Sequence, residues 1–275
     1  MKSKKIFFFI FACLLLTSCK SLHTYYQICE VNSTLETSST GNYKYSDDAC
    51  SISYDFWGNG GNPGFIFSNN LDEIIYIDLS KSFFIKNGIA HDYYLQRTAS
   101  ISTYSSKNNT TFINTMNEAQ EFSILSPHPL IEIAEKAIIA IPPHSSKDIS
   151  EYVISSQFFY DCENNITPTK KEVPTYKYLS TNSPLTFSNY ITYRIGDNTT
   201  EHSFINSFYV SSVSFYHNDA AITKVNIGCP NQRKEVEVVK GASPRKFYIR
   251  YTIESNVPLK SSIKGPKGNV KHNLN

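Results

Sequence analysis

Apolar and polar residues alternate along many short stretches of this chain. In residues 74–79 (IIYIDL), the aliphatic side chains of Ile75, Ile77 and Leu79 occupy every second position. Residues 246–254 (KFYIRYTIE) repeat the pattern over a longer span. A period of two residues places alternate side chains on opposite faces of a strand. The pattern therefore predicts β-strands that each have one covered face.

Turn signals separate these stretches. The dipeptide Asn87-Gly88 and the prolines of residues 163–186 interrupt the alternation. Residues 131–141 (IEIAEKAIIAI) fit either a helix or a strand, and the Pro142-Pro143 stop favours a strand at their end. The chain has 19 tyrosines and 18 phenylalanines, which also favour strands. We predict an all-β fold, an antiparallel β-sandwich with little helix, for which an immunoglobulin-like arrangement is one form.

The N-terminal segment, residues 1–18, has the layout of a targeting signal. Lysines at positions 2, 4 and 5 precede an apolar run over residues 6–16 (IFFFIFACLLL). This run is shorter than the ~20 apolar residues that a membrane-spanning helix needs. It leads into Leu16-Thr17-Ser18-Cys19. An ordinary secretory signal with a chance cysteine is one interpretation of this segment.

The tetrapeptide Leu16-Thr17-Ser18-Cys19 resembles the lipobox of bacterial lipoproteins, in which an aliphatic residue and two small residues precede the lipidated cysteine. The resemblance implies that residues 1–18 are a lipoprotein signal peptide and that Cys19 becomes the first residue. It also implies that Cys19 carries acyl chains such as palmitate. Several acyl chains hold a protein stably on a membrane, whereas a single chain holds it only marginally.

The residues that follow Cys19 help to predict the membrane in which the protein lies. Lys20 stands where enteric lipoproteins retained in the inner membrane have Asp, which implies the outer membrane. Exported lipoproteins of Bacteroides-type bacteria carry an acidic cluster after the cysteine, and KSLHTYYQ has none. In its lipobox and its aromatic, asparagine-rich strands the chain resembles envelope lipoproteins of Bacteroides-type bacteria, which implies no activity. We expect a lipid-anchored outer-membrane protein that faces the periplasm rather than the cell surface.

Composition divides the remaining chain. Residues 19–49 are polar and rich in serine and threonine, which predicts a tether. Residues 50–254 hold the strand patterns and predict the β-sandwich domain, with two β-domains divided near residues 163–186 as the alternative. Residues 255–275 contain lysines and no acidic residue, and they predict a disordered basic tail.

The charge balance argues against one class of partner. The formal net charge is +2, but three of the 26 basic residues lie in the signal segment, and the chain has 24 acidic residues. Removal of the signal therefore leaves a nearly neutral protein. Because nucleic-acid binding proteins need a basic surface, we expect no nucleic-acid partner.

Four cysteines remain once the signal is removed and Cys19 is lipidated. An even number in an exported chain suggests disulfides. Of the three possible pairings we predict Cys29–Cys50 and Cys162–Cys229, the local choice. Buried free thiols are the alternative. Metal ligation is disfavoured because there is no CxxC motif and no histidine at ligand spacing, so we expect no metal and no cofactor.

The glycine-rich stretch at residues 57–64 (WGNGGNPG) could be a phosphate-binding loop or a turn. A phosphate loop needs a lysine and a following helix. This stretch has no lysine and leads into GFIF, an apolar run typical of a strand. It therefore predicts a turn, with Trp57 capping one end of the core. The chain also has no GxSxG motif, and we assign no catalytic residue.

Aromatic residues are the remaining candidates for function. Trp57, Tyr93 and Tyr94 could form a binding surface for a glycan or a protein. The sequence thus predicts a non-catalytic binding or assembly module whose partner is an envelope protein or a glycan. The alternative is a carbohydrate-active or peptide hydrolase with a loop site near Asp55 and Trp57. Two carboxylates with raised pKa in a deep pocket would favour the hydrolase, and a flat or edge-strand aromatic patch would favour the binding module.

Overall fold

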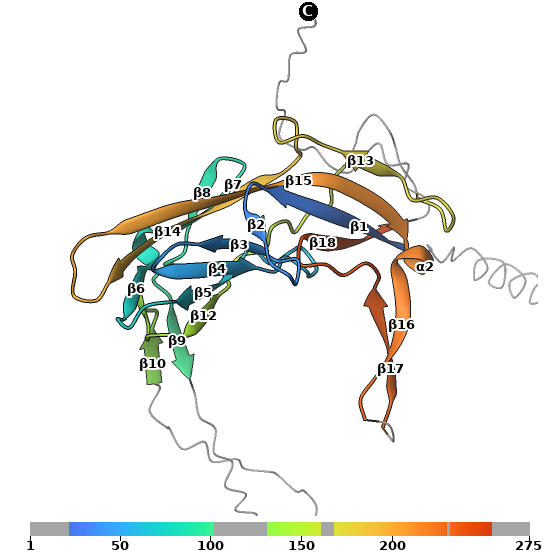
Figure 1. Ribbon diagram of the computed structural model, residues 1–275. Coiled ribbons are helices and arrows are strands. Elements are labelled where there is room, and N and C mark those ends of the chain that lie inside the picture. The colour runs from blue at the N-terminus through green and yellow to red at the C-terminus, as the bar shows by residue number, and fades with distance from the viewer. Residues whose placement is uncertain (1–21, 102–130, 161–167, 230–231, 255–275) are drawn as a thin grey trace, which may run out of the picture.

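The computed structural model describes residues 22–101, 131–160, 168–229 and 232–254. Two antiparallel sheets pack in a sandwich-like arrangement (Figure 1). The prediction of an all-β fold with little helix is confirmed. The immunoglobulin-like form stays a prediction.

The larger sheet has nine strands. Its main path runs in the order β11 (Ile138–Ile141), β6 (Ile75–Asp78), β14 (Thr186–Ile195), β15 (His202–His217), β1 (Leu22–Ser33) and β18 (Lys246–Glu254). Off this path, β7 (Phe83–Lys86) pairs with β14 and with β8 (Ile89–Asp92), and β13 (Thr175–Lys177) pairs with β15.

The smaller sheet has five strands and lies beneath β14 and β15 in Figure 1. Its order is β12 (Ser146–Ile149), β5 (Phe65–Asn69), β4 (Cys50–Tyr54), β3 (Tyr43–Ser46) and β2 (Glu36–Thr37). Two further pairs of strands form separate two-stranded sheets: β9 (Thr98–Ile101) with β10 (Ile131–Ala134), and β16 (Ile222–Ile227) with β17 (Lys234–Val239). Among the described residues, the helical elements are the 3-10 helix η1 (Leu79–Lys81) and the short helix α2 (Asn218–Ala221).

Aromatic side chains from both sheets fill the core. The ring of Phe208 on β15 lies 4.8 Å from that of Tyr54 and 5.1 Å from that of Phe187, measured between centroids. Burial of one such side chain contributes roughly 1.5–3 kcal/mol. The largest fully buried aromatic side chains are Tyr54, Phe56, Phe65, Phe67, Phe84, Phe187 and Phe247. Ring packing between the sheets is therefore a main source of stability.

The sequence alternation matches the faces of the strands. Ile75 and Ile77 of β6 are buried, whereas Tyr76 between them is half-exposed. On β18, Phe247 and Ile249 are buried in the same way. Residues 131–141 form β10 and β11 and not a helix, which agrees with the strand that the two prolines favoured.

Two buried asparagines on neighbouring strands connect the sheets. Asn206 donates a hydrogen bond from Nδ2 to the Tyr54 hydroxyl at 2.8 Å. Its cross-strand partner Asn189 accepts from the Tyr93 hydroxyl at 2.7 Å and donates from Nδ2 to the Pro63 carbonyl at 2.8 Å. A buried amide without partners costs several kcal/mol, so these bonds fix the position of β14 and β15 over the smaller sheet.

The predicted polar tether over residues 19–49 is wrong from Leu22 onward. β1 lies between β15 and β18 and buries every residue from Tyr25 to Cys29. A strand covered on both faces does not alternate, so its pattern is harder to read in a sequence. Even Gln27 is buried there, because its side chain donates to the Phe159 carbonyl at 2.6 Å and accepts from the Phe159 amide at 2.7 Å.

The proline-rich connection at residues 163–186 does not divide the described chain into two β-domains. β14 and β15 follow it in sequence and pair with β6, β7 and β1, which precede it. Strands from both sides of the connection therefore belong to one sheet, and the alternative of a division there is contradicted.

Several predictions made from the sequence concern residues outside the described ranges. These are the signal segment 1–18, the lipidation of Cys19 and the basic tail 255–275. Within the described ranges, the structure contains no helix of the length and apolar character that crossing a membrane requires.

Candidate functional site

The glycine-rich stretch carries the chain from β4 toward β5. Gly60 N donates to the Tyr248 carbonyl at 2.7 Å, and Tyr248 N donates to the Gly58 carbonyl at 3.0 Å. Gly61 N donates to the same Gly58 carbonyl at 3.2 Å. The amides of Gly60 and Gly61 are thus bound within the protein and not directed at an anion. Because β5 begins at Phe65, the predicted turn into a strand is confirmed.

Trp57 lies at the surface of the core and not inside it. Its ring is half-buried and packs on Tyr248, with 5.3 Å between ring centroids. The preceding residue, Phe56, is fully buried and caps the core instead. Asp55 is exposed, and its Oδ1 accepts a hydrogen bond from Trp57 N at 3.0 Å. The prediction that Trp57 caps the core is therefore wrong, since Phe56 takes that place, and Asp55 serves a local turn.

Tyr93 and Tyr94 do not join Trp57 in one aromatic surface. Tyr93 is 2% exposed, and its ring packs against Phe65 and Tyr152. Tyr94 is half-buried beside the same core. A binding surface made of Trp57, Tyr93 and Tyr94 is contradicted, because Tyr93 faces the interior.

Three cysteines in the described ranges are free thiols. Cys29 on β1 and Cys50 on β4 are both fully buried, and the predicted Cys29–Cys50 disulfide is wrong. Closeness in sequence did not bring them together: Cys29 pairs with Val213 and Phe247, whereas Cys50 pairs with Asn69. Burial raises the pKa of the Cys29 thiol well above its ordinary value and that of Cys50 to about 12, so both are poor nucleophiles.

The second predicted disulfide involves one described cysteine. Cys229 is an exposed free thiol at the end of the β16–β17 hairpin. Its predicted partner, Cys162, lies outside the described residues.

A groove of about 450 Å³ lies beside the edge strands β11 and β12. Two of its lining residues are the carboxylates Glu135 and Glu151. Arg97 binds both, from Nη2 to Glu135 Oε1 at 2.8 Å and from Nη1 to Glu151 Oε1 at 2.5 Å. The remaining lining residues are Leu79, Tyr93, Lys136, Ile138, Ile139, Ala140, Lys147, Ile149 and Ser150.

This pair of carboxylates lacks the electrostatics of a hydrolase acid. The hydrogen bond from the Arg97 side chain, together with those from the Arg97 and Leu95 amides, lowers the pKa of Glu135. A glycosidase needs one carboxyl group that keeps its proton near neutral pH. Because Arg97 favours the ionised carboxylate, the groove does not supply that acid at Glu135.

A second, smaller pocket lies on the outer face of the larger sheet. It has a volume of about 290 Å³. Its lining residues come from η1, β7, β14 and the start of β15, and they are Ser80, Lys81, Phe83, Tyr190, Thr192, Glu201 and Ser203. We refer to these seven residues as the outer-face pocket. The volume is near the lower end of the roughly 300–1,000 Å³ typical of ligand pockets.

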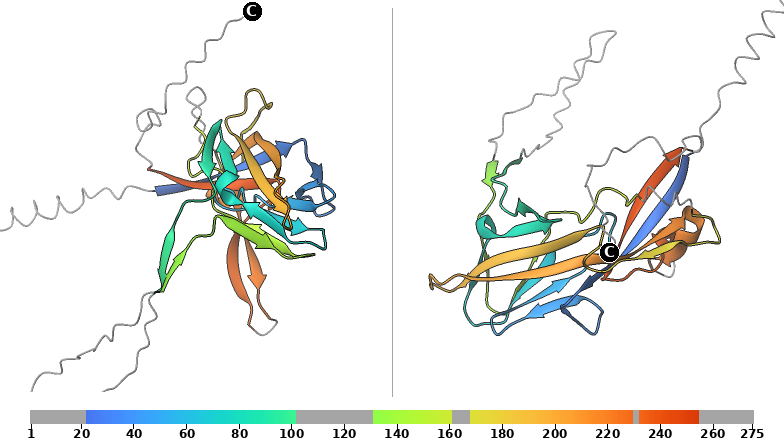
Figure 2. Two further views of the ribbon diagram at one scale, coloured as in Figure 1. Left: turned by 90° about the vertical axis from the view of Figure 1, so that its left-hand side faces the viewer. Right: turned by 90° about the horizontal axis from the view of Figure 1, so that it is seen from above.

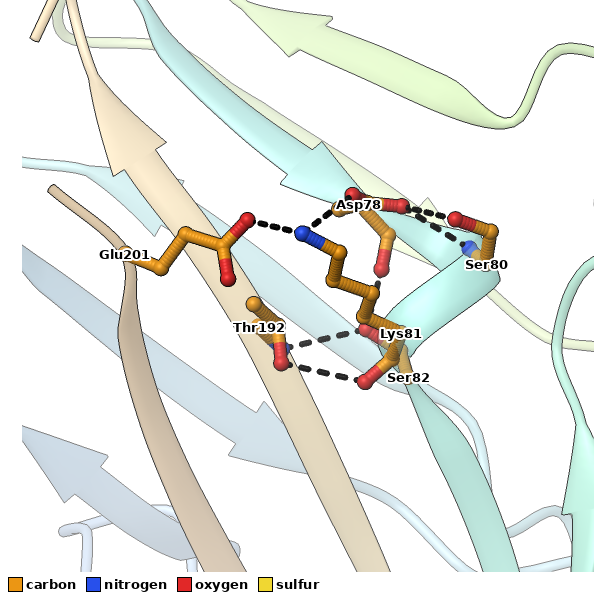
Figure 3. Close-up of polar contacts among 6 residues, drawn as sticks. All are labelled: Asp78, Ser80, Lys81, Ser82, Thr192 and Glu201. Carbon is orange, nitrogen blue, oxygen red and sulfur yellow. Dashed lines mark hydrogen bonds and ion pairs between the residues drawn. The ribbon is translucent and has the colours of Figure 1, made fainter. Parts of the chain in front are cut away.

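The short helix η1 positions one side of the outer-face pocket. Asp78 caps η1 by accepting from Ser80 N at 3.0 Å and from Ser80 Oγ at 2.5 Å. Thr192 on β14 then holds η1 against the sheet, since its Oγ1 donates to the Lys81 carbonyl at 3.0 Å and its amide donates to Ser82 Oγ at 3.1 Å (Figure 3). The backbone of Lys81 is thereby fixed over the sheet.

Charged groups lie at the rim of this pocket. Lys81 Nζ forms an ion pair with Glu201, and Asp78 Oδ2 lies 3.9 Å from the same nitrogen (Figure 3). The hydrogen bond with Glu201 raises the pKa of Lys81. Both side chains are about half exposed, so a ligand could reach a donor and an acceptor at one place.

Two aromatic side chains form part of the pocket's wall, and an aliphatic side chain lies next to them. Phe83 and Tyr190 are cross-strand partners, and their ring centroids are 6.3 Å apart. Both are half-buried. Ile205, the partner of Tyr190 on β15, is 53% exposed and extends the apolar row across a third strand. The result is an open, partly aromatic patch on the outer face of the sheet.

Sequence reasoning missed this pocket, although one signal pointed toward it. The alternation in residues 190–195 (YITYRI) puts Ile191 and Tyr193 on one face and therefore Tyr190 and Thr192 on the other. What it does not reveal is the pairing of β14 with β7, which brings Phe83 beside Tyr190.

No family model, no curated protein and no solved structure matches this chain.

Proposed function

We propose that this protein is an envelope lipoprotein, anchored in the outer membrane through lipid on Cys19, whose β-sandwich is a non-catalytic module that binds a glycan in the outer-face pocket. The lipobox Leu16-Thr17-Ser18-Cys19 supports the anchor. One observation carries the glycan part: the half-exposed pair Phe83 and Tyr190 stands beside the Lys81–Glu201 ion pair in one open pocket.

This combination suits a sugar ring. The face of an aromatic ring packs against the apolar C–H face of a sugar, as Phe83 and Tyr190 could do. Sugar hydroxyls both donate and accept hydrogen bonds, and Glu201 and Lys81 offer an acceptor and a donor. Ser203 adds an exposed hydroxyl on β15. A pocket of about 290 Å³ fits roughly one terminal sugar of a longer chain.

A binding role is better supported than the alternative hydrolase. A hydrolase near Asp55 and Trp57 would need a carboxylate free to act on a substrate, whereas Asp55 accepts from the Trp57 amide in a surface turn. The two carboxylates that share a groove, Glu135 and Glu151, are both bound by Arg97. The outer-face pocket is shallow and aromatic, the kind of site that favours the binding module.

Binding to immobilised neutral and acidic oligosaccharides would test the glycan part. We expect purified protein to bind a subset of them and Tyr190→Ala to lose most of that binding. Tyr209→Ala is the matched control. Tyr209 lies on β15, on the same outer face of the larger sheet as Tyr190, but outside the pocket. Equal binding by both variants, or no binding by the parent protein, would contradict a glycan site here.

Membrane fractionation would test the anchor separately. We expect Cys19→Ala to move the protein from the membrane to the soluble fraction. Protease treatment of intact cells should leave the parent protein uncut if it faces the periplasm. Continued membrane association of the variant would contradict the lipid anchor.

A further inference from the structure

The β16–β17 hairpin extends away from both sheets of the sandwich, as Figure 1 and the left view of Figure 2 show. Its two strands pair only with each other among the described strands. Its base is fixed by α2, where Lys240 N donates to the Ala221 carbonyl at 2.8 Å. We call residues 222–229 and 232–239 the arm. A two-stranded ribbon is marginally stable by itself, so a partner surface would stabilise it.

One face of the arm is apolar and the other is charged. Val225 and Val236 are direct partners, and Ile227 and Val238 lie on the same face because side chains two residues apart share it. Val225, Ile227 and Val238 are 36%, 50% and 37% exposed. On the opposite face, Lys224 forms an ion pair with Glu235 at 2.7 Å. The arm is therefore amphipathic and its apolar face is open.

Charge favours one kind of surface for this face. The segment from Ile222 to Lys240 has four basic residues, at positions 224, 233, 234 and 240, and two acidic ones, at 235 and 237. Lys234 stands opposite Ile227 on the apolar face, near the end of the arm. A lysine there can bury its methylene stem while its ammonium stays among phosphates. Each basic residue near an anionic bilayer strengthens binding roughly fivefold.

The base of the arm lies beside the start of β1, the strand that follows Cys19 in sequence. Tyr25, near the start of β1, pairs with His217, and α2 and the arm follow His217 directly. Leu22 follows Cys19 by three positions in the sequence, a length of chain that spans at most about 11 Å. The arm is about 20 Å long for its six residues per strand. A lipid on Cys19 would therefore hold the arm within reach of the bilayer.

We propose that the apolar face of the arm inserts into the interface of an anionic phospholipid bilayer and orients the sandwich on the membrane. The proposal rests in part on the proposed lipid anchor, which sets the distance to the bilayer. The driving forces are burial of the four aliphatic side chains and attraction of the basic residues to lipid phosphates. The outer-face pocket lies on a different sheet from the arm.

Cys229 at the end of the arm offers a natural position for a probe. Among the described cysteines, Cys29 and Cys50 are fully buried and Cys229 is exposed. Cys162, which lies outside the described residues, would be replaced by serine in every variant. A polarity-sensitive fluorophore would be attached to Cys229 in the full lipidated protein. The protein would be reconstituted in phosphatidylcholine vesicles with and without phosphatidylglycerol. Quenchers on the lipid acyl chains would then report contact with the bilayer.

We expect the Cys229 probe to shift to shorter wavelength and to lose most of its emission to the lipid quenchers when phosphatidylglycerol is present. The variant with Val225→Ser and Ile227→Ser keeps every charge and should lose both effects. As a matched control, a probe on Ile89→Cys in a Cys229→Ser background should stay in water, because Ile89 is 65% exposed on β8 at a distance from the arm (Figure 1).

Two results would overturn the proposal. A probe that stays in water in all vesicles would show that the arm does not enter the bilayer. A probe already shifted without lipid and unaffected by vesicles would show that another protein surface, such as a second copy, covers the apolar face. Failure of the anchor is seen separately: the protein would then be soluble, and the same probe measured with added vesicles would report the arm alone.

Discussion

The core strands of the sandwich and the β16–β17 arm have the same alternation of apolar and polar residues with opposite outcomes. On β18, Phe247 and Ile249 belong to the hydrophobic core and are almost fully buried. On β16, Val225 and Ile227 have the same spacing and stay exposed. Alternation thus tells which side chains share a face, while the neighbouring sheet decides whether that face is covered. The two regions should respond very differently to mutation, and paired substitutions can measure the difference.

The largest contrast is expected between Phe208→Ala in the core and Ile227→Ala in the arm. Phe208 is buried among the rings of Tyr54, Phe56 and Phe187, so its removal leaves a cavity. We expect a loss of about 3–5 kcal/mol in the free energy of unfolding. Ile227→Ala should change it by less than about 0.5 kcal/mol. Urea denaturation of both variants measures the contrast, and losses of equal size would show that the arm is covered.

Two glycines provide the same comparison between a buried and an open position, this time for the backbone. Gly61 has φ +73°, and a Cβ there would lie 2.8 Å from Ile154 Cδ1 and from Phe247 Cγ. Gly88 has φ +80° in the β7–β8 turn, with nothing within 4 Å of a Cβ. Both Gly→Ala variants incur the strain of a positive φ, about 1–2 kcal/mol.

Overpacking adds about 1–3 kcal/mol to that strain only at Gly61, for a total of about 2–5 kcal/mol. Thermal and urea unfolding of Gly61→Ala and Gly88→Ala would compare them. If Gly88→Ala were as destabilising as Gly61→Ala, the close contact of Gly61 with Ile154 and Phe247 would not be the cause.

The same distinction limits what the sequence can predict. Face alternation is local, so the strands at residues 75–78 and 246–254 and the Asn87-Gly88 turn were predictable, and Asn87 indeed has φ 48°. β1 escaped detection because both of its faces are covered, which removes the alternation. Its polar Gln27 also found partners on a segment 132 residues away.

The candidate site was harder to predict because pairing between distant strands builds it. Lys81 and Glu201 are 120 residues apart, and Phe83 meets Tyr190 only through the pairing of β7 with β14. Sequence spacing carries no record of such pairings. It also favoured Cys29–Cys50 as neighbours, whereas each thiol is buried in a different sheet.

Two aspartates in turns, half-buried Asp47 and exposed Asp55, provide a comparison in which stability depends on pH. Asp47 is half-buried and accepts from the amides of Ala49 at 2.9 Å and Cys50 at 2.7 Å, and from the hydroxyls of Tyr45 and Tyr193. Burial alone would raise the pKa of this carboxyl, but the hydrogen bonds from Cys50, Ala49 and Tyr45 outweigh burial and lower it. The ionised carboxylate therefore stabilises the folded protein.

We expect Asp47→Ala to lose about 2 kcal/mol near neutral pH. Because the pKa is lowered on folding, this stabilisation is present above the unfolded pKa of about 3.9 and disappears as the pH falls through the lower native value. The difference between wild type and variant should thus narrow below about pH 4. Asp55→Ala is the control, since exposed Asp55 makes one turn hydrogen bond. If the difference in unfolding free energy between wild type and Asp47→Ala did not depend on pH, the charge of Asp47 would not be its cause.

A small effect is expected at Trp57, whose exposure lies between that of the core residues and that of the arm. Its ring is half-buried on Tyr248, whereas its neighbour Phe56 is fully buried with ring contacts to Tyr54 and Phe208. Trp57→Ala should therefore lower the free energy of unfolding by about 1 kcal/mol. Phe56→Ala should lower it by about 3–5 kcal/mol. Urea titrations of the two variants give both values under one set of conditions.

Trp57→Ala also separates the glycine-rich turn from the proposed binding role. Trp57 is not part of the outer-face pocket, so oligosaccharide binding by the folded variant should equal that of the parent protein. A loss of binding without loss of stability would move the binding site to the turn near Asp55 and Trp57. A loss of stability as large as that of Phe56→Ala would instead make Trp57 a core residue, because the burial of a side chain, rather than its size, sets the cost of removing it.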